Sequence, residues 1–99
     1  MDNKQLANIF YETADLMEVQ GDDTFRIRSY RRAAEALESV PQQIADIVND
    51  QKALLAIPGI GKGMVLNLQE IFREGHLKLH QELLQKYRPS MLELLKIDT

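Results

Sequence analysis

Apolar residues recur along the chain with the spacing of amphipathic helices. In each of four segments they fall at intervals of three and four residues, which places them on one face of a helix. No window alternates apolar and polar residues at a period of two, so strands are not expected. The pattern predicts an all-α protein, a small bundle of about five to six helices. The four stripes are Leu6, Ile9, Phe10, Thr13, Leu16 and Met17; Ile27, Tyr30, Ala34 and Leu37; Met64, Val65, Leu68, Ile71 and Phe72; and Leu79, Leu83, Leu84 and Tyr87.

Capping residues predict where several helices begin. Asp23 or Thr24 offers an N-cap for the second helix, because both side chains accept hydrogen bonds from free helix amides. Pro41 suits the first turn of a third helix. Ser90, three residues before Glu93, predicts a capping box that starts a last short helix.

Composition and charge narrow the classes of protein that remain. The chain has 99 residues and no cysteine, which fits one domain over residues 1–99 and excludes disulfides and thiolate metal sites. It has no apolar run of membrane-spanning length and no signal peptide, so we expect a cytoplasmic protein with no membrane partner. The net charge is −3, yet residues 26–34 hold four arginines and no acid.

The arginines form a compact basic spot in an acidic chain. Arg28, Arg31 and Arg32 fall within an arc of about 100° on a helix, opposite the apolar stripe. Such a cluster can attract an anion even when the whole protein is negative. The alternative is an ordinary solvated helix face.

The turn Ile57-Pro58-Gly59-Ile60-Gly61-Lys62-Gly63 has the chemistry of a phosphate site. Gly59 and Gly61 bring the backbone close to whatever lies outside, and the next helix starts near Lys62. Its free N–H groups and dipole therefore point into the same space as the lysine charge, which favours a phosphate. The alternative is a plain helix-turn-helix corner.

The segment from Leu55 to Gly63 resembles a helix-hairpin-helix motif. Upstream, Phe25-Arg26-Ile27-Arg28-Ser29-Tyr30-Arg31-Arg32-Ala33-Ala34 is similar to the F-R-x-x-A-Y-R-x-A-A segment of bacterial family X DNA polymerases. Residues 7–16, 71–75 and 91–97 match the same family in order and spacing. The chain therefore resembles the N-terminal DNA-binding domain of these polymerase beta-like enzymes.

The resemblance implies sequence-nonspecific binding to the DNA backbone, at gaps or nicks with a 5′-phosphate, in DNA repair such as base excision repair. We expect a monomer. The chain is either a piece of a longer polymerase or a stand-alone remnant, and the first is favoured because the helix that ends at Lys96 has little left to pack against. The implied site residues are the hairpin amides of Gly59, Gly61 and Gly63 with Lys62; the pocket and face residues Arg26, Arg28, Tyr30, Arg31 and Arg32; and the carbonyls of Leu55, Ile57 and Ile60, which would hold Na+ or K+.

One departure from the family bears on activity. Asn67 stands where lyase-active members have the lysine that forms a Schiff base, and an amide cannot supply that nucleophile. The other matching positions, Arg26, Gly63 and Leu79, offer no substitute lysine. We expect no lyase activity, and the chain contains no polymerase palm.

Other features leave alternatives open. Tyr30 could stack on a nucleotide, although its place on the apolar stripe favours burial. His76 and His80 could be a metal pair at i, i+4, although a surface pair is more common. For the chain as a whole, the alternative to DNA binding is a helical protein-interaction domain that keeps the hairpin scaffold, which would suit the acidic net charge.

Overall fold

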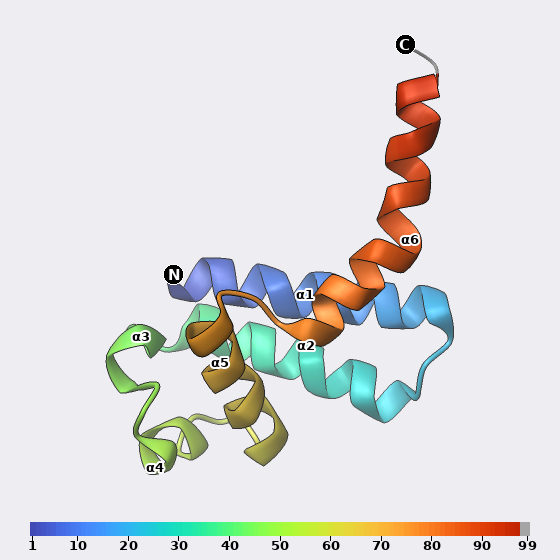
Figure 1. The fold of residues 1–99 in the computed structure, drawn as a ribbon. Helices are drawn as coiled ribbons and strands as arrows, with labels where there is room; N and C mark the ends of the chain where they lie inside the picture. Colours follow the sequence, from blue (N-terminus) through green and yellow to red (C-terminus); the bar gives the residue numbers. More distant parts are fainter. Residues whose placement is uncertain (98–99) are drawn as a thin grey trace.

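The computed structural model describes the backbone of residues 1–97 and the side chains of residues 1–87. That part of the chain forms six helices and no strand, which confirms the expected small all-α bundle (Figure 1). None of these helices has the length and apolar character needed to cross a membrane. In chain order they are α1 (Asn3–Gln20), α2 (Thr24–Ser39), α3 (Ile44–Ile47), α4 (Gln51–Leu55), α5 (Lys62–Glu74) and α6 (Lys78–Ile97).

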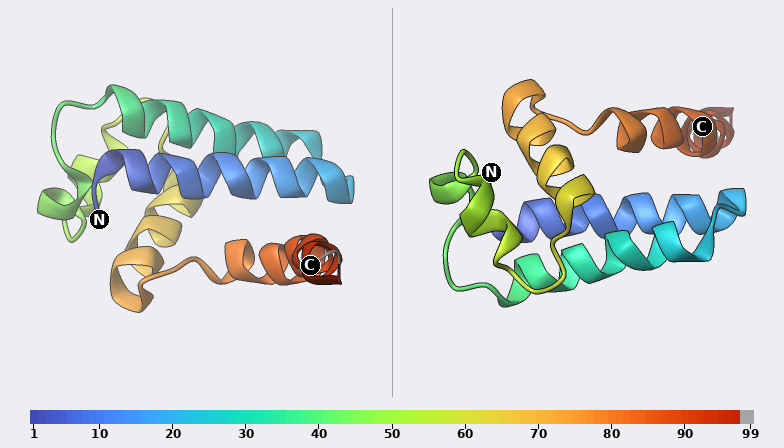
Figure 2. Two further views of the ribbon diagram at one scale, coloured as in Figure 1. Left: turned by 90° about the horizontal axis from the view of Figure 1, so that it is seen from above. Right: turned by 90° about the horizontal axis from the view of Figure 1, so that it is seen from below.

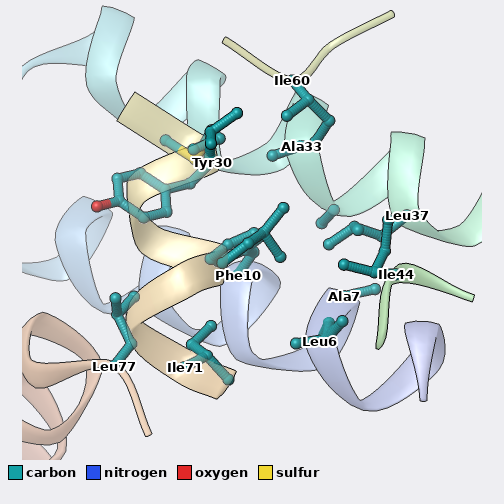
Figure 3. Packing of buried hydrophobic residues seen from close by; sticks show 14 of the residues in the cluster. Leu6, Ala7, Phe10, Tyr30, Ala33, Leu37, Ile44, Ile60, Ile71 and Leu77 are labelled. Atoms are coloured by element: carbon teal, nitrogen blue, oxygen red, sulfur yellow. The ribbon is translucent and has the colours of Figure 1, made fainter. Parts of the chain in front are cut away.

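The core lies between the antiparallel pair α1–α2 and helix α5, which crosses it (Figure 2). Phe10 of α1 is fully buried, and its ring meets that of Tyr30 edge-on at 5.8 Å between centroids. Around this pair the apolar stripes of α1, α2 and α5 face one another, as the periodicity predicts (Figure 3). The Asp23 carboxylate accepts a hydrogen bond from the Phe25 amide at 2.9 Å, so Asp23 is the N-cap of α2.

The start of α3 differs from the prediction, because the cap comes from another helix. The third helix begins at Ile44 and not at Pro41. The Asn3 side chain accepts a hydrogen bond from the Ile44 amide at 2.8 Å and donates one to the Gln42 carbonyl at 2.6 Å. A buried polar side chain 41 residues away therefore sets this boundary.

Helix α6 is continuous where the sequence predicted a break before Ser90. Pro89 lies within the helix, where a missing N–H removes one backbone hydrogen bond and bends the helix without ending it. Figure 1 shows the second half of α6 pointing away from the bundle. The expected side-chain contact between Ser90 and Glu93 lies outside the described side chains.

Candidate nucleic-acid interface

Helices α4 and α5 are joined by a tight hairpin, residues 56–61, that is anchored from both sides. Ile57 and Ile60 are buried, and the Ile60 amide donates to the Ile57 carbonyl at 3.1 Å. Between them Gly59 has a φ of +97°, and a Cβ there would lie 3.1 Å from the Arg32 carbonyl oxygen. The hairpin backbone therefore rests directly on α2, an approach that only glycine permits.

The packing of the chain gives no such reason for glycine at Gly61 and Gly63. Gly61 has an ordinary φ of −94° and Gly63 lies in the first turn of α5. A Cβ at either position would meet nothing within 4 Å. Gly61 is the N-cap of α5, and no side chain of the described residues caps the free amides of this helix. Glycine here leaves these amides open to a molecule outside the chain.

A shallow hollow of about 420 Å³ lies where the hairpin meets α2, and we call it the hairpin hollow. It brings backbone amides and a helix N-terminus together with a cationic side chain, which is the chemistry that binds a phosphate. The exposed Lys62 follows directly at the start of α5. The lining residues are Ser29, Arg32, Gly59, Ile60, Gly61, Gly63 and Met64.

Four basic residues of α2 and of the start of α5 carry uncompensated charge. Arg26, Arg28 and Arg32 are exposed on α2, and within the described side chains none of them or Lys62 forms an ion pair. Because the chain as a whole is acidic, these unpaired cations are its candidate residues for binding an anion.

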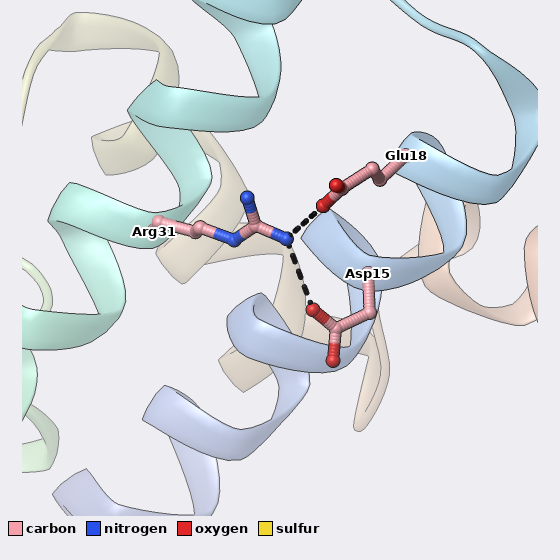
Figure 4. A network of polar contacts seen from close by, with 3 residues as sticks. All are labelled: Asp15, Glu18 and Arg31. Atoms are coloured by element: carbon pink, nitrogen blue, oxygen red, sulfur yellow. Dashed lines mark hydrogen bonds and ion pairs between the residues drawn. The ribbon is translucent and has the colours of Figure 1, made fainter.

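Arg31 is the exception in the predicted arginine cluster (Figure 4). Its guanidinium points to α1, where it pairs with Asp15 at 3.2 Å and with Glu18. The hydrogen bond to Glu18, followed by that to Asp15, raises the pKa of the Arg31 guanidinium above its ordinary value. The helix pattern placed Arg31 with Arg28 and Arg32, but it could not show that α1 presents two carboxylates to it.

Tyr30 is buried, with 6% of its surface exposed, so its ring is not available to stack on a nucleotide. Its hydroxyl lies at the edge of the core and accepts a hydrogen bond from the Asn67 amide at 3.2 Å. Tyr30 and Asn67 thus form a neutral polar pair between α2 and α5.

Phe25 is an exposed surface residue that the sequence interpretation did not single out. It is 74% exposed, the highest value among the large apolar side chains described. The Arg28 guanidinium lies 6.0 Å from its ring centroid, and Phe25 shares one helix face with Ser29 and Arg32 at i, i+4 and i+7. Its place opposite the apolar stripe of α2 was the signal that could have identified it.

His76 and His80 do not have the arrangement on one helix face that their spacing suggested. Helix α6 starts at Lys78, so His76 precedes it and the i, i+4 spacing does not put both rings on one face. His80 is buried, against the expectation of a surface pair, and its Nε2 lies 2.7 Å from Glu12 of α1. Among the described residues, no group of three or more histidine or acidic side chains could hold a metal ion.

A larger hollow of about 710 Å³ lies on the other flank of the hairpin, but its lining is mostly apolar. Ala53, Ala56 and Pro58 form one wall and the outer face of α2 the other. It lacks the free helix amides of the hairpin hollow, so it does not have the chemistry of a phosphate site.

Replacing Gly63 with alanine should separate folding from ligand binding. Alanine favours a helix over glycine by about 0.5–1 kcal/mol, so the variant should unfold at a slightly higher denaturant concentration. The added methyl group crowds the α5 amides, so affinity for a phosphate-bearing ligand should fall several-fold. Urea unfolding and fluorescence anisotropy measure the two effects, and a parallel loss of stability and binding would contradict this assignment.

Comparisons with known proteins agree with this geometry. A family model described as a helix-hairpin-helix domain matches residues 1–77. The chain is also similar to the DNA polymerase/3′-5′ exonuclease PolX of Bacillus subtilis (strain 168), with 27% identity over 97 residues. The match covers 98% of this chain and 16% of that relative, so the chain spans about one-sixth of its length. The family match extends through the hairpin and all of α5, and the chain belongs to the helix-hairpin-helix domain family.

Proposed function

We propose that this chain binds DNA through the phosphate backbone, without reading bases, and prefers a gap or nick that carries a 5′-phosphate. A DNA-binding role is supported by the family and by the similarity to PolX. The observation that carries the proposal is the pair Gly61 and Gly63, which the fold does not require and which leave the α5 amides open. In this arrangement one phosphate sits at the hairpin hollow, held by these amides and Lys62.

The rest of the surface argues for contacts to the backbone. The hairpin hollow offers amides and cations, which hold phosphates but carry no sequence information. Arg28 and Arg32 extend the same face along α2, where they can reach further phosphates of the same strand. Because the affinity comes from ionic contacts in an otherwise acidic chain, it should fall steeply with salt.

The preference for a gap rests on the N-terminal half of α2. Arg26 is exposed there without an ion pair among the described side chains, and the Tyr30 hydroxyl reaches the edge of the core nearby. Together they supply a charge and a donor for a terminal 5′-phosphate. The exposed ring of Phe25 offers a stacking surface for a base that a gap leaves unpaired.

Two further elements belong to this proposal. The Asn67 amide, which donates a hydrogen bond to the Tyr30 hydroxyl, can contact a phosphate or sugar but cannot form a Schiff base. The chain therefore binds the DNA end without lyase chemistry.

Among the hairpin carbonyls, that of Ile57 accepts one amide hydrogen bond, and a carbonyl oxygen has a second lone pair. With Leu55 and Ile60 it could ligate Na+ or K+, which would reinforce the phosphate contact.

The test is fluorescence anisotropy on a short-gap DNA, with and without the downstream 5′-phosphate, across a salt series. We expect tighter binding with the phosphate and a loss of affinity as salt rises. Arg26→Gln should remove most of the phosphate-dependent gain, whereas Arg73→Gln, which removes an exposed arginine at the far end of α5, should leave it. No binding to either DNA at low salt would favour the protein-interaction domain instead.

A further inference from the structure

Among the arginines of α2, Arg31 is the one that forms ion pairs within the described side chains. Its guanidinium is shared between Asp15 and Glu18, which lie one turn apart on α1 (Figure 4). Both carboxylates are well exposed, with 72% and 61% of their side-chain surface open to solvent. Ion pairs in such a setting are weak and screened by salt, so these carboxylates and another anion compete for the guanidinium on similar terms.

Arg31 also lines a second hollow on α2, of about 370 Å³, which we call the arginine hollow. Arg28, Arg31 and Arg32 all line it, together with Thr24, Ile27 and Glu35. Arg32 also lines the hairpin hollow, so the two hollows adjoin at this side chain. Three guanidiniums turned into this hollow would outweigh the single carboxylate of Glu35 and would form a phosphate site, because each can donate two parallel hydrogen bonds.

We propose that Asp15 and Glu18 are an internal competitor of DNA: they occupy Arg31 and so weaken a second phosphate site in the arginine hollow. The inference rests on the proposed DNA binding and adds its regulation. In the free protein Arg28 and Arg32 are open and Arg31 is held by α1. While the two carboxylates hold Arg31, a backbone phosphate that lies along α2 meets only Arg28 and Arg32. When the carboxylates lose their charge, the phosphate takes the third arginine as well.

The test is the double variant Asp15→Asn/Glu18→Gln, which keeps the shape of both side chains and removes their charge. We expect DNA affinity at low salt to rise about five- to ten-fold. The slope of log affinity against log salt should steepen by about 0.9, the effect of one more phosphate contact. The matched control is Asp22→Asn/Glu38→Gln, which removes the same two charges from residues that bond to Gln20 and Tyr11 and not to Arg31. Its effect should be less than two-fold.

Arg31 variants show whether the gain comes through this guanidinium. Arg31→Gln should change affinity little in the native chain, where Arg31 is already occupied, and should abolish the gain in the double variant. Arg31→Lys should restore part of the gain, because it keeps the charge. Thermal unfolding of each variant confirms that the fold is retained.

The outcomes separate this inference from the function on which it rests. Two results would disprove the competition for Arg31 while DNA binding stands. In the first, the native chain binds DNA but the double variant behaves like its matched control. In the second, the affinity gained by the double variant survives Arg31→Gln. If the native chain and the double variant both fail to bind DNA at low salt, the proposed function itself fails.

Discussion

Reversing the charge at the start of α5, by Lys62→Glu, should weaken DNA binding about 30- to 100-fold, or about 2–3 kcal/mol. Lys62 is exposed beside the open amides of α5, and no acid among the described side chains compensates its charge. A glutamate there would face the phosphate directly and repel it. Anisotropy at one low and one physiological salt concentration measures the loss.

The control for this variant is Lys4→Glu, which makes the same charge change on α1. Lys4 lines neither the hairpin hollow nor the arginine hollow. It should weaken binding only through the change in net charge, by a few-fold. Equal losses for the two variants would show that binding follows net charge and that the hairpin has no special part in it.

Gly59→Ala should give the largest loss of stability of the substitutions considered, about 1–3 kcal/mol. The φ of +97° is unfavourable for any residue with a Cβ, and the new methyl would press on the Arg32 carbonyl oxygen at 3.1 Å and on the Ala36 side chain at 3.2 Å. The hairpin would have to lift from α2, so DNA affinity should fall as well. Urea denaturation followed by circular dichroism measures the stability.

Gly21→Ala separates the cost of the positive φ from the cost of the close contact with α2. Gly21 also has a positive φ, of +80°, but a Cβ there would meet nothing within 4 Å. It should therefore show the backbone cost alone and leave DNA binding intact. If Gly59→Ala costs no more than Gly21→Ala, the close approach of the hairpin to α2 is not a source of stability.

Features encoded within one helix or turn could be predicted from the sequence. The apolar stripes identified α1, α2 and α5, and the Asp23 cap follows from local capping chemistry. The closely spaced Pro and Gly residues of 57–63 predicted the turn, and the resemblance of the surrounding segments identified it as a helix-hairpin-helix motif. Burial of Tyr30 followed from its place on the apolar stripe.

Features that depend on a neighbouring helix could not be predicted. The Asn3 side chain caps α3, His80 meets Glu12, and Arg31 meets two acids of α1. In each case the residue's own helix shows the direction of the side chain, but its partner is set by tertiary packing. The charge pattern therefore identified the basic cluster of α2 without showing that only part of it is free.

The central claim is that the hairpin and the first turn of α5 hold the DNA backbone. Chemical-shift mapping of the backbone amides during titration with a 5′-phosphorylated gapped DNA tests it most directly. We expect the largest shifts at Gly61, Lys62 and Gly63, whose N–H groups would donate to a phosphate, and smaller ones along the exposed face of α2. Largest shifts on α1 or α6, with residues 61–63 unchanged, would contradict the account.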